Sequence, residues 1–277
     1  MLNCDSLQYK VISTLRFPLS VAIVLLHSNM VETINGGKEY VYFLFITDLF
    51  SNIITRIAVP LFFFISGFLF FCKVNNFTVD IYLKKLKKRI RTLLIPYICW
   101  VLFVAVLYLL VQIFLPNMIS DKQKFIIDYD ISDWFWIFWD TNHISSAFTA
   151  HLPLNGPLWF LRDLMVVMIF SPLLYVLIKR LYLCIVIILG FLWVSSCWFD
   201  IPGFSIDSFF FFSAGAYFGI YKKNFCVLQK LYAIIVLTVF YIALIYFEFY
   251  FQDKCWIFVL HNVGILFGMT LAISLCA

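Results

Sequence analysis

Charged residues are scarce in this chain of 277 residues. Asp, Glu, Lys and Arg make up only 13% of it, against about 25% in an ordinary soluble domain, whereas 64% of the residues are hydrophobic and 21% are aromatic. This composition excludes an ordinary soluble protein and predicts a polytopic integral membrane protein. The net charge of +5 does not indicate a nucleic-acid partner, because the basic residues cluster in short segments where they set topology.

Several chemical signatures are missing as well. The eight cysteines contain no pair with the CxxC spacing of a metal site, and most lie within or beside apolar runs, so we interpret them as small packing residues and expect no bound metal. No small-residue cleavage site follows the first apolar segment, which therefore indicates a retained span and not a signal peptide. The sequence also shows no internal repeat and no soluble domain.

Apolar runs of about 17–25 residues, long enough to cross a bilayer, recur along the chain. They lie near residues 11–31, 41–72, 92–115, 157–178, 181–198, 205–221, 231–251 and 255–277. We therefore predict an all-α, polytopic transmembrane helix bundle of about eight spans that forms one domain over residues 1–277. The second run is too long for one perpendicular crossing. In its first half, Asp48, Asn52 and Arg56 form a polar stripe that faces protein or water, or belongs to a separate interfacial helix.

The charges of the connections predict the orientation of the bundle. Seven cations occur between Lys73 and Arg91, and further basic residues mark the turns at 179–180 and 222–230. The intervening connections are acidic, most clearly between 121 and 140. By the positive-inside rule, the N-terminus and the basic connections are cytoplasmic.

The longest outer connection, about 116–156, contains a cluster of aromatic residues: Trp134, Phe135, Trp136, Phe138 and Trp139. Such residues are typical of a helix that lies at the membrane surface. Two interpretations stay open, a lid over an extracytoplasmic opening and a connector that follows the membrane.

The first apolar segment contains the most informative polar pair, Arg16 and His27. Their separation of eleven residues amounts to roughly 1100° of helix rotation, about 20° from three whole turns, so both side chains share one helix face. They lie about 16 Å apart along the axis, half of the hydrocarbon thickness. Ionisable groups in a span are costly and usually functional, so the pair indicates an intramembrane path or reaction centre. Alternatively, Arg16 snorkels to the interface and His27 caps the far end of the segment.

Five local patterns, taken in order, resemble the membrane-bound acyltransferase family 3, bacterial O-acyltransferases that modify surface polysaccharides and related acceptors. They are Arg16-x10-His27, Phe62-Phe63-x-x-Ser66-Gly67 within VPLFFFISGFLF, the basic run KKLKKRIRTLLIPYICW, the segment GPLWFLRDLMVVMIFSPLLY at the fourth span, and the weaker FFFFSAGAYFG near 209–219. Together they touch most of residues 11–219.

The resemblance implies an enzyme that transfers acyl groups other than aminoacyl groups, with O-acetylation as the expected reaction. It implies a cytoplasmic donor, acetyl-CoA or another acyl-CoA, an acceptor hydroxyl on a cell-surface glycan or lipid-linked sugar, and a multi-pass position in the bacterial inner membrane. The family usually has about ten spans. Eight spans and an apolar end at Ala277 are therefore typical of a fragment or a truncated homologue.

The residue types fit this chemistry. Transfer to a hydroxyl needs a base, and histidine titrates near pH 6.5, so we predict His27 as the catalytic acid/base residue, with Arg16 on the same face. Acyl-CoA carries several phosphates, which predicts donor-binding cations at the inner interface: Arg89, Arg91 and Lys88. The family pattern is Arg-x-x-Arg, whereas this spacing reads Lys88-x-x-Arg91, and lysine lacks the bidentate fork of arginine. The same run also suits a purely topological role or the binding of anionic headgroups.

Three more residues are candidates for the lining of a cavity: Ser66, Trp159 and Arg162. Ser66-Gly67 suits close helix packing, with Ser66 in a cavity wall as the alternative, because no GxSxG motif supports a nucleophile. Trp159, Arg162 and Asp163 open the fourth span, where they fit acceptor binding or interfacial anchoring. Arg162 and Asp163 are adjacent, so their side chains start about 100° apart and need not pair.

Two other functions remain open. A transporter would use Arg16, His27, Asp48 and Arg56 as a polar relay, although the repeated, interrupted spans of many transporters are missing from the sequence. An inactive, truncated homologue would have no catalytic role. In the last span we interpret His261 as a packed polar residue.

Overall fold

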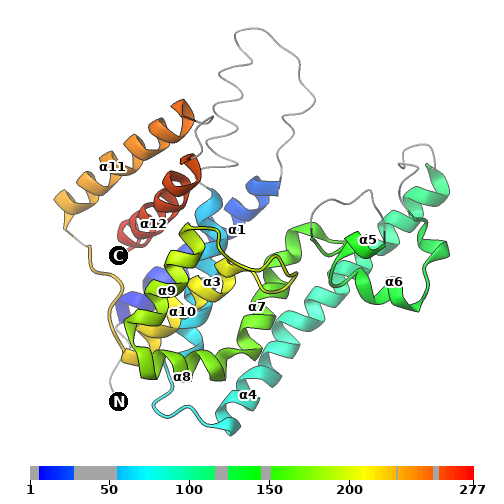
Figure 1. Cartoon of the computed structure of the whole chain (residues 1–277), viewed down its shortest axis with the longest axis horizontal. Helices are drawn as coiled ribbons and strands as arrows, with labels where there is room; N and C mark the ends of the chain where they lie inside the picture. Colours follow the sequence, from blue (N-terminus) through cyan, green and yellow to red (C-terminus); the bar gives the residue numbers. More distant parts are fainter. Residues whose placement is uncertain (1–5, 28–54, 116–123, 145–150, 229, 252–255) are drawn as a thin grey trace. The chain divides into compact units, whose positions relative to one another are not determined.

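The structure, a computed structural model, describes residues 6–27, 55–115, 124–144, 151–228, 230–251 and 256–277 (Figure 1). In chain order its elements are α1 (Ser6–His27), η3 (Thr55–Ile57), α3 (Ala58–Phe71), α4 (Val79–Arg89), η4 (Ile90–Leu94), α5 (Ile95–Phe114), η6 (Ile126–Asp128), α6 (Ile131–Trp136), η7 (Thr141–His143), η8 (Gly156–Leu158), α7 (Trp159–Ile169), α8 (Ser171–Leu181), α9 (Leu183–Val194), α10 (Ile206–Tyr221), α11 (Leu231–Tyr250) and α12 (Ile257–Leu275). Every regular element in the described ranges is helical, so the predicted all-α membrane helix bundle is confirmed.

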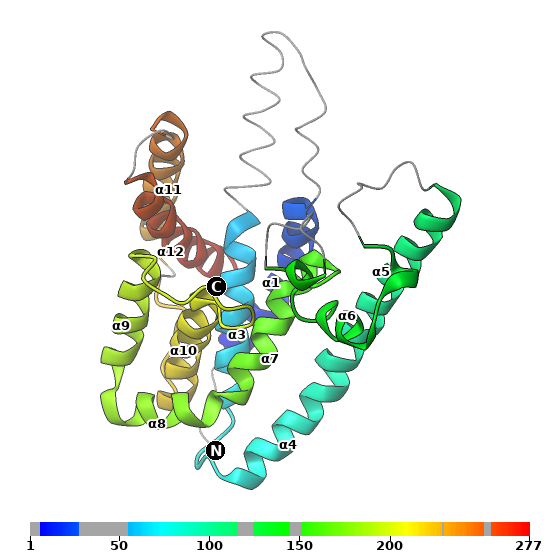
Figure 2. The ribbon, with the colours of Figure 1, turned by 45° about the vertical axis from the view of Figure 1, so that its right-hand side comes forward.

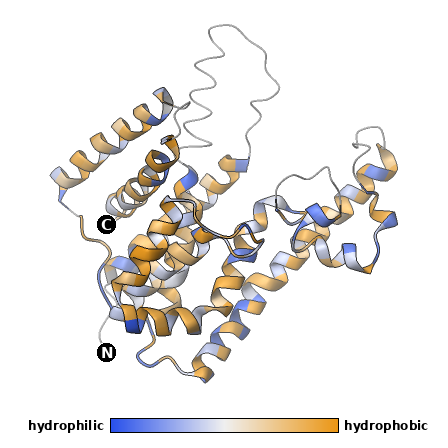
Figure 3. Cartoon of the chain, viewed as in Figure 1, coloured by the Kyte–Doolittle hydropathy of each residue, from blue (hydrophilic) through white to orange (hydrophobic). Residues whose placement is uncertain are grey.

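Four of the described helices are long and apolar enough to cross a membrane, or five if one bent pair counts as a single span. Figure 3 shows hydrophobic residues dominating the visible sides of α5 and α11. The count of eight spans and the cytoplasmic N-terminus stay predictions. The stripe of Asp48, Asn52 and Arg56 is described only at Arg56, because the other two residues lie outside the described ranges.

The chain divides into two compact units. The described residues of the first unit fall within 1–75, 177–197 and 210–277, and those of the second within 76–176 and 198–209. Among the candidate residues, the first unit therefore contains Arg16, His27 and Ser66, and the second contains Lys88, Arg89, Arg91, Trp159 and Arg162.

In the first unit α1, α3 and α12 pack side by side (Figures 1 and 2). Helix α1 buries one face, formed by Val11, Ile12, Leu15 and Leu19 at helical spacing. It runs antiparallel to α3, because its first half contacts the end of α3 while η3, which precedes α3, also packs against it.

Glycines bring the backbones of α3 and α10 into direct contact. A Cβ atom on Gly67 of α3 would lie 2.0 Å from the carbonyl oxygen of Phe212, and one on Gly215 of α10 would lie 1.9 Å from that of Phe64. Both distances are far below van der Waals contact, so only glycine fits at these two positions. The close packing predicted for the Ser66-Gly67 pair is therefore present at Gly67, and the small residue admits the neighbouring backbone.

In the second unit, residues Val79–Phe114 form one helix of 36 residues. We expected the third span to begin at residue 92, with the basic run in a connection. Instead Thr78 caps the helix by accepting a hydrogen bond from the backbone N–H of Ile81, and the lysine-rich run is helical because lysine and arginine are good helix formers. Since Pro96 lacks an N–H and crowds the preceding turn, the helix widens just before it into the π turn η4, where the Ile95 N–H donates to the Ile90 carbonyl.

The fourth predicted span, 157–178, is not one straight helix. Helices α7 and α8 meet at an angle of 63°, with Phe170 at the break. Pro172 in the first turn of α8 explains the interruption, because its ring cannot follow an unbroken helix. Helix α8 then continues to Leu181, so the basic pair at 179–180 lies in its last turn instead of a loop, where cations interact favourably with the helix dipole.

The described part of the long connection between α5 and α7 folds back along α5. Its Ile126, Ile137, Ile144 and Leu154 form a buried cluster with Tyr97, Val101 and Ala105 of the helix. The predicted surface helix corresponds to α6, which has only six residues and a capping box made by Asp130 and Asp133. The two interpretations of this connection, a lid over an extracytoplasmic opening and a connector that follows the membrane, both stay predictions.

Candidate functional site

Arg16 and His27 share one side of α1. The helix continues through Pro18, and the Ser20 hydroxyl donates a hydrogen bond of 2.9 Å to the carbonyl of Arg16. Both candidate side chains are exposed. At about 100° per residue they point roughly a quarter turn away from the centre of the buried face around Leu15. The polar cavity that we expected for this pair stays a prediction.

The antiparallel packing of α1 and α3 indicates which residues lie at the same height. The Tyr9 hydroxyl oxygen is 3.3 Å from the Cys72 sulfur. Measured from this contact along the helix axes, His27 lies about 27 Å away toward the C-terminal end of α1, and Arg56 lies about 24 Å away toward the N-terminal end of α3, in η3. Because the helices are antiparallel, both distances run in the same direction. The two therefore lie within about one helical turn of the same height. By the same count, Arg16 is level with the half-buried Ser66.

Arg56, Glu248 and His261 form a polar cluster on η3, α11 and α12. His261 Nδ1 lies 2.5 Å from Glu248 Oε1, and Arg56 Nη1 lies 2.8 Å from His261 Nε2, the shorter of its two ring contacts. An ionised carboxylate only accepts, so Nδ1 donates to Glu248 while Nε2 accepts from Arg56, and the ring is neutral. The opposite charges of Arg56 and Glu248 offset each other, which apolar surroundings require.

Sequence reasoning missed this cluster. It placed Arg56 in a polar stripe and treated His261 as a packed residue, but the two are 205 residues apart and no local spacing joins them. Their position level with His27 places four ionisable side chains at one end of the first unit, from four different elements.

The cations predicted to bind a donor lie at the junction of α4, η4 and α5. Arg89 is half-buried, whereas Lys88 and Arg91 are exposed. The Thr92 hydroxyl donates to the Lys88 carbonyl at 3.1 Å within the same turn. Because η4 is a π turn, the spacing Lys88-x-x-Arg91 is not that of a regular α-helix, and π turns inside helices are often found at functional sites.

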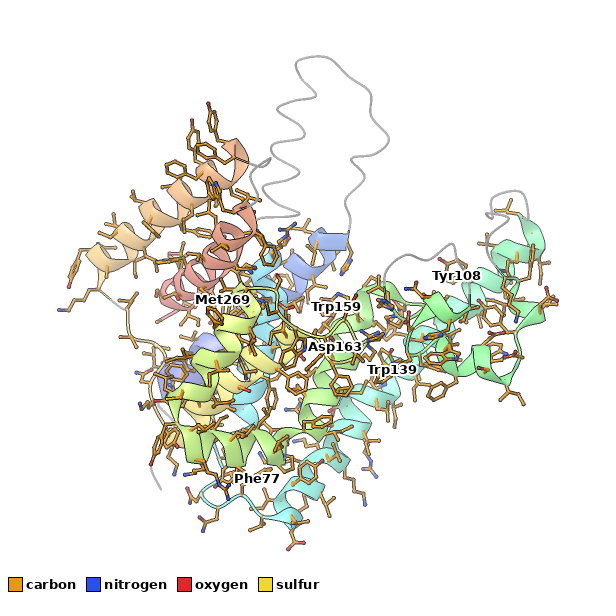
Figure 4. All side chains as sticks on the ribbon, in the orientation of Figure 1. Phe77, Tyr108, Trp139, Trp159, Asp163 and Met269 are labelled. Atoms are coloured by element: carbon orange, nitrogen blue, oxygen red, sulfur yellow. The ribbon has the colours of Figure 1, made fainter. Side chains whose placement is uncertain are left out.

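Arg162 and Asp163 do pair, although adjacency made no pair necessary. Arg162 Nε donates to Asp163 Oδ1 at 2.9 Å, and both side chains are at most 5% exposed. The long arginine side chain bends back, so its starting direction does not decide its partner. Its Nη1 also donates to the carbonyls of Trp139, at 2.6 Å, and His151, at 3.2 Å. Figure 4 shows Trp139, Trp159 and Asp163 gathered at the N-terminal end of α7.

A second pair that sequence reasoning missed lies beside Arg162. Asp140 is buried, and its Oδ2 lies 2.7 Å from Nδ1 of His151. Little in the sequence points to this pair, since Asp140 stands among the aromatic residues of a long connection and His151 belongs to no motif.

Comparison with known proteins decides the family. The family model described as an acyltransferase domain, that of acyltransferase family 3, matches residues 10–277. The chain belongs to acyltransferase family 3. The resemblance inferred from Arg16, His27 and the motifs that follow them is thereby confirmed.

One curated relative of this acyltransferase is the succinoglycan biosynthesis protein ExoH of Rhizobium meliloti (strain 1021). The two are 34% identical over an alignment 133 residues long, which covers 45% of this chain and 30% of the relative. The chain thus matches less than a third of the relative's length. No solved structure matches the acyltransferase chain.

Proposed function

We propose that the protein is an O-acyltransferase of the bacterial inner membrane. It transfers an acyl group, with acetyl as the expected group, from cytoplasmic acyl-CoA to a hydroxyl of a cell-surface glycan or lipid-linked sugar. The observation that carries the proposal is the family match over residues 10–277. A glycan acceptor is supported by the relative, whose name places it in the biosynthesis of the polysaccharide succinoglycan.

In this proposal His27 transfers the proton. The acceptor oxygen attacks the thioester carbonyl carbon, His27 takes the hydroxyl proton, and the carbon–sulfur bond breaks as the ester carbon–oxygen bond forms. The proton then passes to the sulfur, which leaves as a thiol. Arg16, on the same side of α1, supplies positive charge near the reacting groups, and Arg56 lies at the height of His27. Ser66, level with Arg16, is proposed to line the same part of the first unit.

The donor phosphates are proposed to bind the basic turn in the second unit. Arg89 and Arg91 supply guanidinium groups that can hold phosphate oxygens in pairs, and Lys88 adds a point charge. The rival interpretation, anionic lipid headgroups, shares the same chemistry. The two differ in one respect: only a donor site competes with free CoA.

The experiment is an assay of the purified protein in detergent with acetyl-CoA labelled in the acetyl group and a glycan or methyl glycoside acceptor. We expect the label to move to the acceptor, with one free thiol released for each acetyl group transferred. The proposal is overturned if acetyl-CoA and longer acyl-CoA donors are all left intact by a folded protein. Label that stays on the protein would identify an acyl-enzyme.

A further inference from the structure

A buried aspartate and an exposed histidine form a dyad that the proposed chemistry at His27 does not use. Asp140 is 1% exposed, whereas the side chain of His151 is 44% exposed. The carboxylate of Asp140 accepts from His151 Nδ1 at 2.7 Å and from the backbone N–H of Asn142 at 3.1 Å. A buried carboxylate with a partly exposed imidazole partner leaves the histidine accessible to a ligand while fixing its orientation.

The contact determines which ring nitrogen is available. An ionised carboxylate only accepts hydrogen bonds, so Nδ1 carries a proton and donates it to Asp140. The other nitrogen, Nε2, has no hydrogen-bond partner among the described residues. The same logic orients the histidines of catalytic triads and of metal sites, where an acidic partner sets the tautomer and direction of the ring.

The backbone on both sides of the dyad is held by α7. Arg162, itself 4% exposed, donates to the carbonyl of Trp139, which precedes Asp140, and to the carbonyl of His151. The two segments are joined again where the backbone N–H and the hydroxyl of Thr141 both contact the Leu152 carbonyl, at 2.9 and 3.0 Å. Arg162 therefore acts as a positioning residue for both members of the dyad.

A tight aromatic contact fixes Trp139 as well. The guanidinium of Arg162 lies 5.8 Å from the centre of the Trp139 ring, and a Cβ atom on Gly203 would lie 2.8 Å from the same ring. Gly203 also has φ +89°, a backbone conformation that favours glycine. The chain thus uses a buried ion pair, an aromatic ring and a glycine to keep the dyad in place.

A second imidazole lies beside the same carboxylate. His143 Nε2 is 3.9 Å from Asp140 Oδ2, its side chain is 54% exposed, and its ring stacks on Trp136 with centroids 3.8 Å apart. One surface of the second unit therefore presents two accessible imidazoles and an aromatic ring around one buried acid. Hydroxyl-binding groups next to flat rings suit a sugar, whose hydroxyls need hydrogen bonds and whose C–H faces pack on rings.

We propose that the Asp140–His151 dyad binds a hydroxyl of the acceptor sugar through His151 Nε2. This inference rests on the proposed function and names the place where its acceptor is held. His151 is the residue that touches the sugar, and Asp140 and Arg162 position it. His27 keeps its role in proton transfer.

The position of the dyad along α5 supports this assignment. The Tyr97 hydroxyl donates to the Phe138 carbonyl, two residues before Asp140. Arg91, in the proposed donor site, precedes Tyr97 by six residues, about 9 Å along the same helix. The proposed acceptor and donor sites therefore lie on one unit, a short distance apart along a single helix.

The charged neighbours of His151 give the site a pH dependence. The hydrogen bond that His151 donates to Asp140 raises the pKa of His151 above its ordinary value; burial and the charge of Arg162 lower this pKa, whereas the charges of Asp140 and Asp200 raise it. A further titratable group, His143, lies beside the same carboxylate. Below the raised pKa, Nε2 carries a proton and donates a charge-assisted hydrogen bond to the sugar oxygen. Acceptor binding should therefore weaken as the pH rises through this pKa.

The first test is kinetic, with methyl glucoside as the acceptor probe and acetyl-CoA as donor. We expect His151→Gln to raise the KM for the glucoside about ten- to a hundredfold while kcat at saturating glucoside changes by less than about threefold. Hydrolysis of acetyl-CoA without acceptor should be unchanged. The exposed Asp128, in the same connection, provides the control Asp128→Asn, which should leave the KM unchanged.

Two results would overturn the assignment: an unchanged KM for the glucoside in His151→Gln, or a loss confined to kcat. Asp200→Asn changes an exposed residue and avoids the folding risk of altering the buried Asp140. It should shift the rise in KM to lower pH, whereas a merely structural role for His151 predicts no shift.

The second test does not require catalysis. The chain has four histidines, so 13C-labelled histidine gives four imidazole signals, of which His151→Gln identifies one. In the wild-type protein that signal should titrate above pH 6.5 and should move on addition of methyl glucoside or an oligosaccharide. If neither sugar moves it, the dyad is structural, even if the protein transfers acyl groups. If the signal moves but no acyl transfer occurs, the proposed function fails and the sugar site stands.

Discussion

The contact between α3 and α10 predicts a large effect from a single methyl group. In Gly67→Ala the new Cβ would lie 2.0 Å from the Phe212 carbonyl oxygen and 3.0 Å from the backbone nitrogen of Ala216. These are backbone atoms, so a side-chain rotation cannot relieve the clash and the two helices must separate. Overpacking typically costs about 1–3 kcal/mol, and a backbone clash falls at the upper end of this range.

Gly→Ala also favours the helix by about 1 kcal/mol, which offsets part of that cost. We therefore expect a net loss of about 2 kcal/mol in the free energy of unfolding, equivalent to a fall of about 4–8 °C in Tm. Gly215→Ala, on the facing helix, should lose a similar amount. The double variant should lose less than the sum, because both substitutions open the same interface.

The assay is thermal unfolding in detergent. Unfolding is monitored by the increase in reaction of a fluorogenic thiol probe as the buried Cys72 and Cys226 become accessible. Gly264→Ala in α12 is the matched control, because its Cβ would approach nothing closer than Glu248 Oε2 at 4.0 Å. It should unfold at the wild-type temperature or slightly above. Equal Tm values for wild type, Gly67→Ala and Gly215→Ala would refute the close contact of the two helices.

Two further predictions concern the donor site and the topology. The double variant Arg89→Ala, Arg91→Ala should weaken acetyl-CoA binding about tenfold or more at low salt, and by less at high salt, where screening already reduces the attraction. The control is the double variant Lys84→Ala, Lys87→Ala in the preceding turns. If both double variants weaken binding equally, the basic run acts only through its general positive charge. In a background without native cysteines, Lys84→Cys and Asp128→Cys should react with an impermeant thiol reagent from opposite sides of the membrane, and labelling from one side would show that the orientation is wrong.

Much of the fold was predictable because membrane helices are set by local composition. The runs near 231–251 and 255–277 correspond closely to α11 and α12, since apolar length alone specifies a helix that can cross a bilayer. The run near 11–31 overlaps α1, which begins five residues earlier, at Ser6. The position of proline likewise accounts for the π turn before Pro96 and the break before Pro172. Such features depend on neighbouring residues in the chain.

Helix partners were not predictable in the same way. Helix α3 is apolar on every side, so no periodicity indicates which face meets α10, and the contact becomes visible only when Gly67 meets the Phe212 backbone. The candidate site shows the same limit. Sequence motifs indicated Arg16, His27 and the basic turn, but the pairing of His261 with Arg56 depends on packing between distant segments.

The measurement that tests the central claim most directly is the acetyl transfer rate of His27→Gln, compared with wild type and His27→Ala at equal amounts of folded, membrane-inserted protein. Glutamine keeps hydrogen-bonding capacity but cannot exchange a proton near neutral pH. Because general acid–base catalysis contributes about 10²–10⁴-fold, both variants should retain at most about one per cent of the wild-type turnover. Near-wild-type turnover in His27→Gln would contradict the account, because His27 would then serve only as a hydrogen-bonding residue.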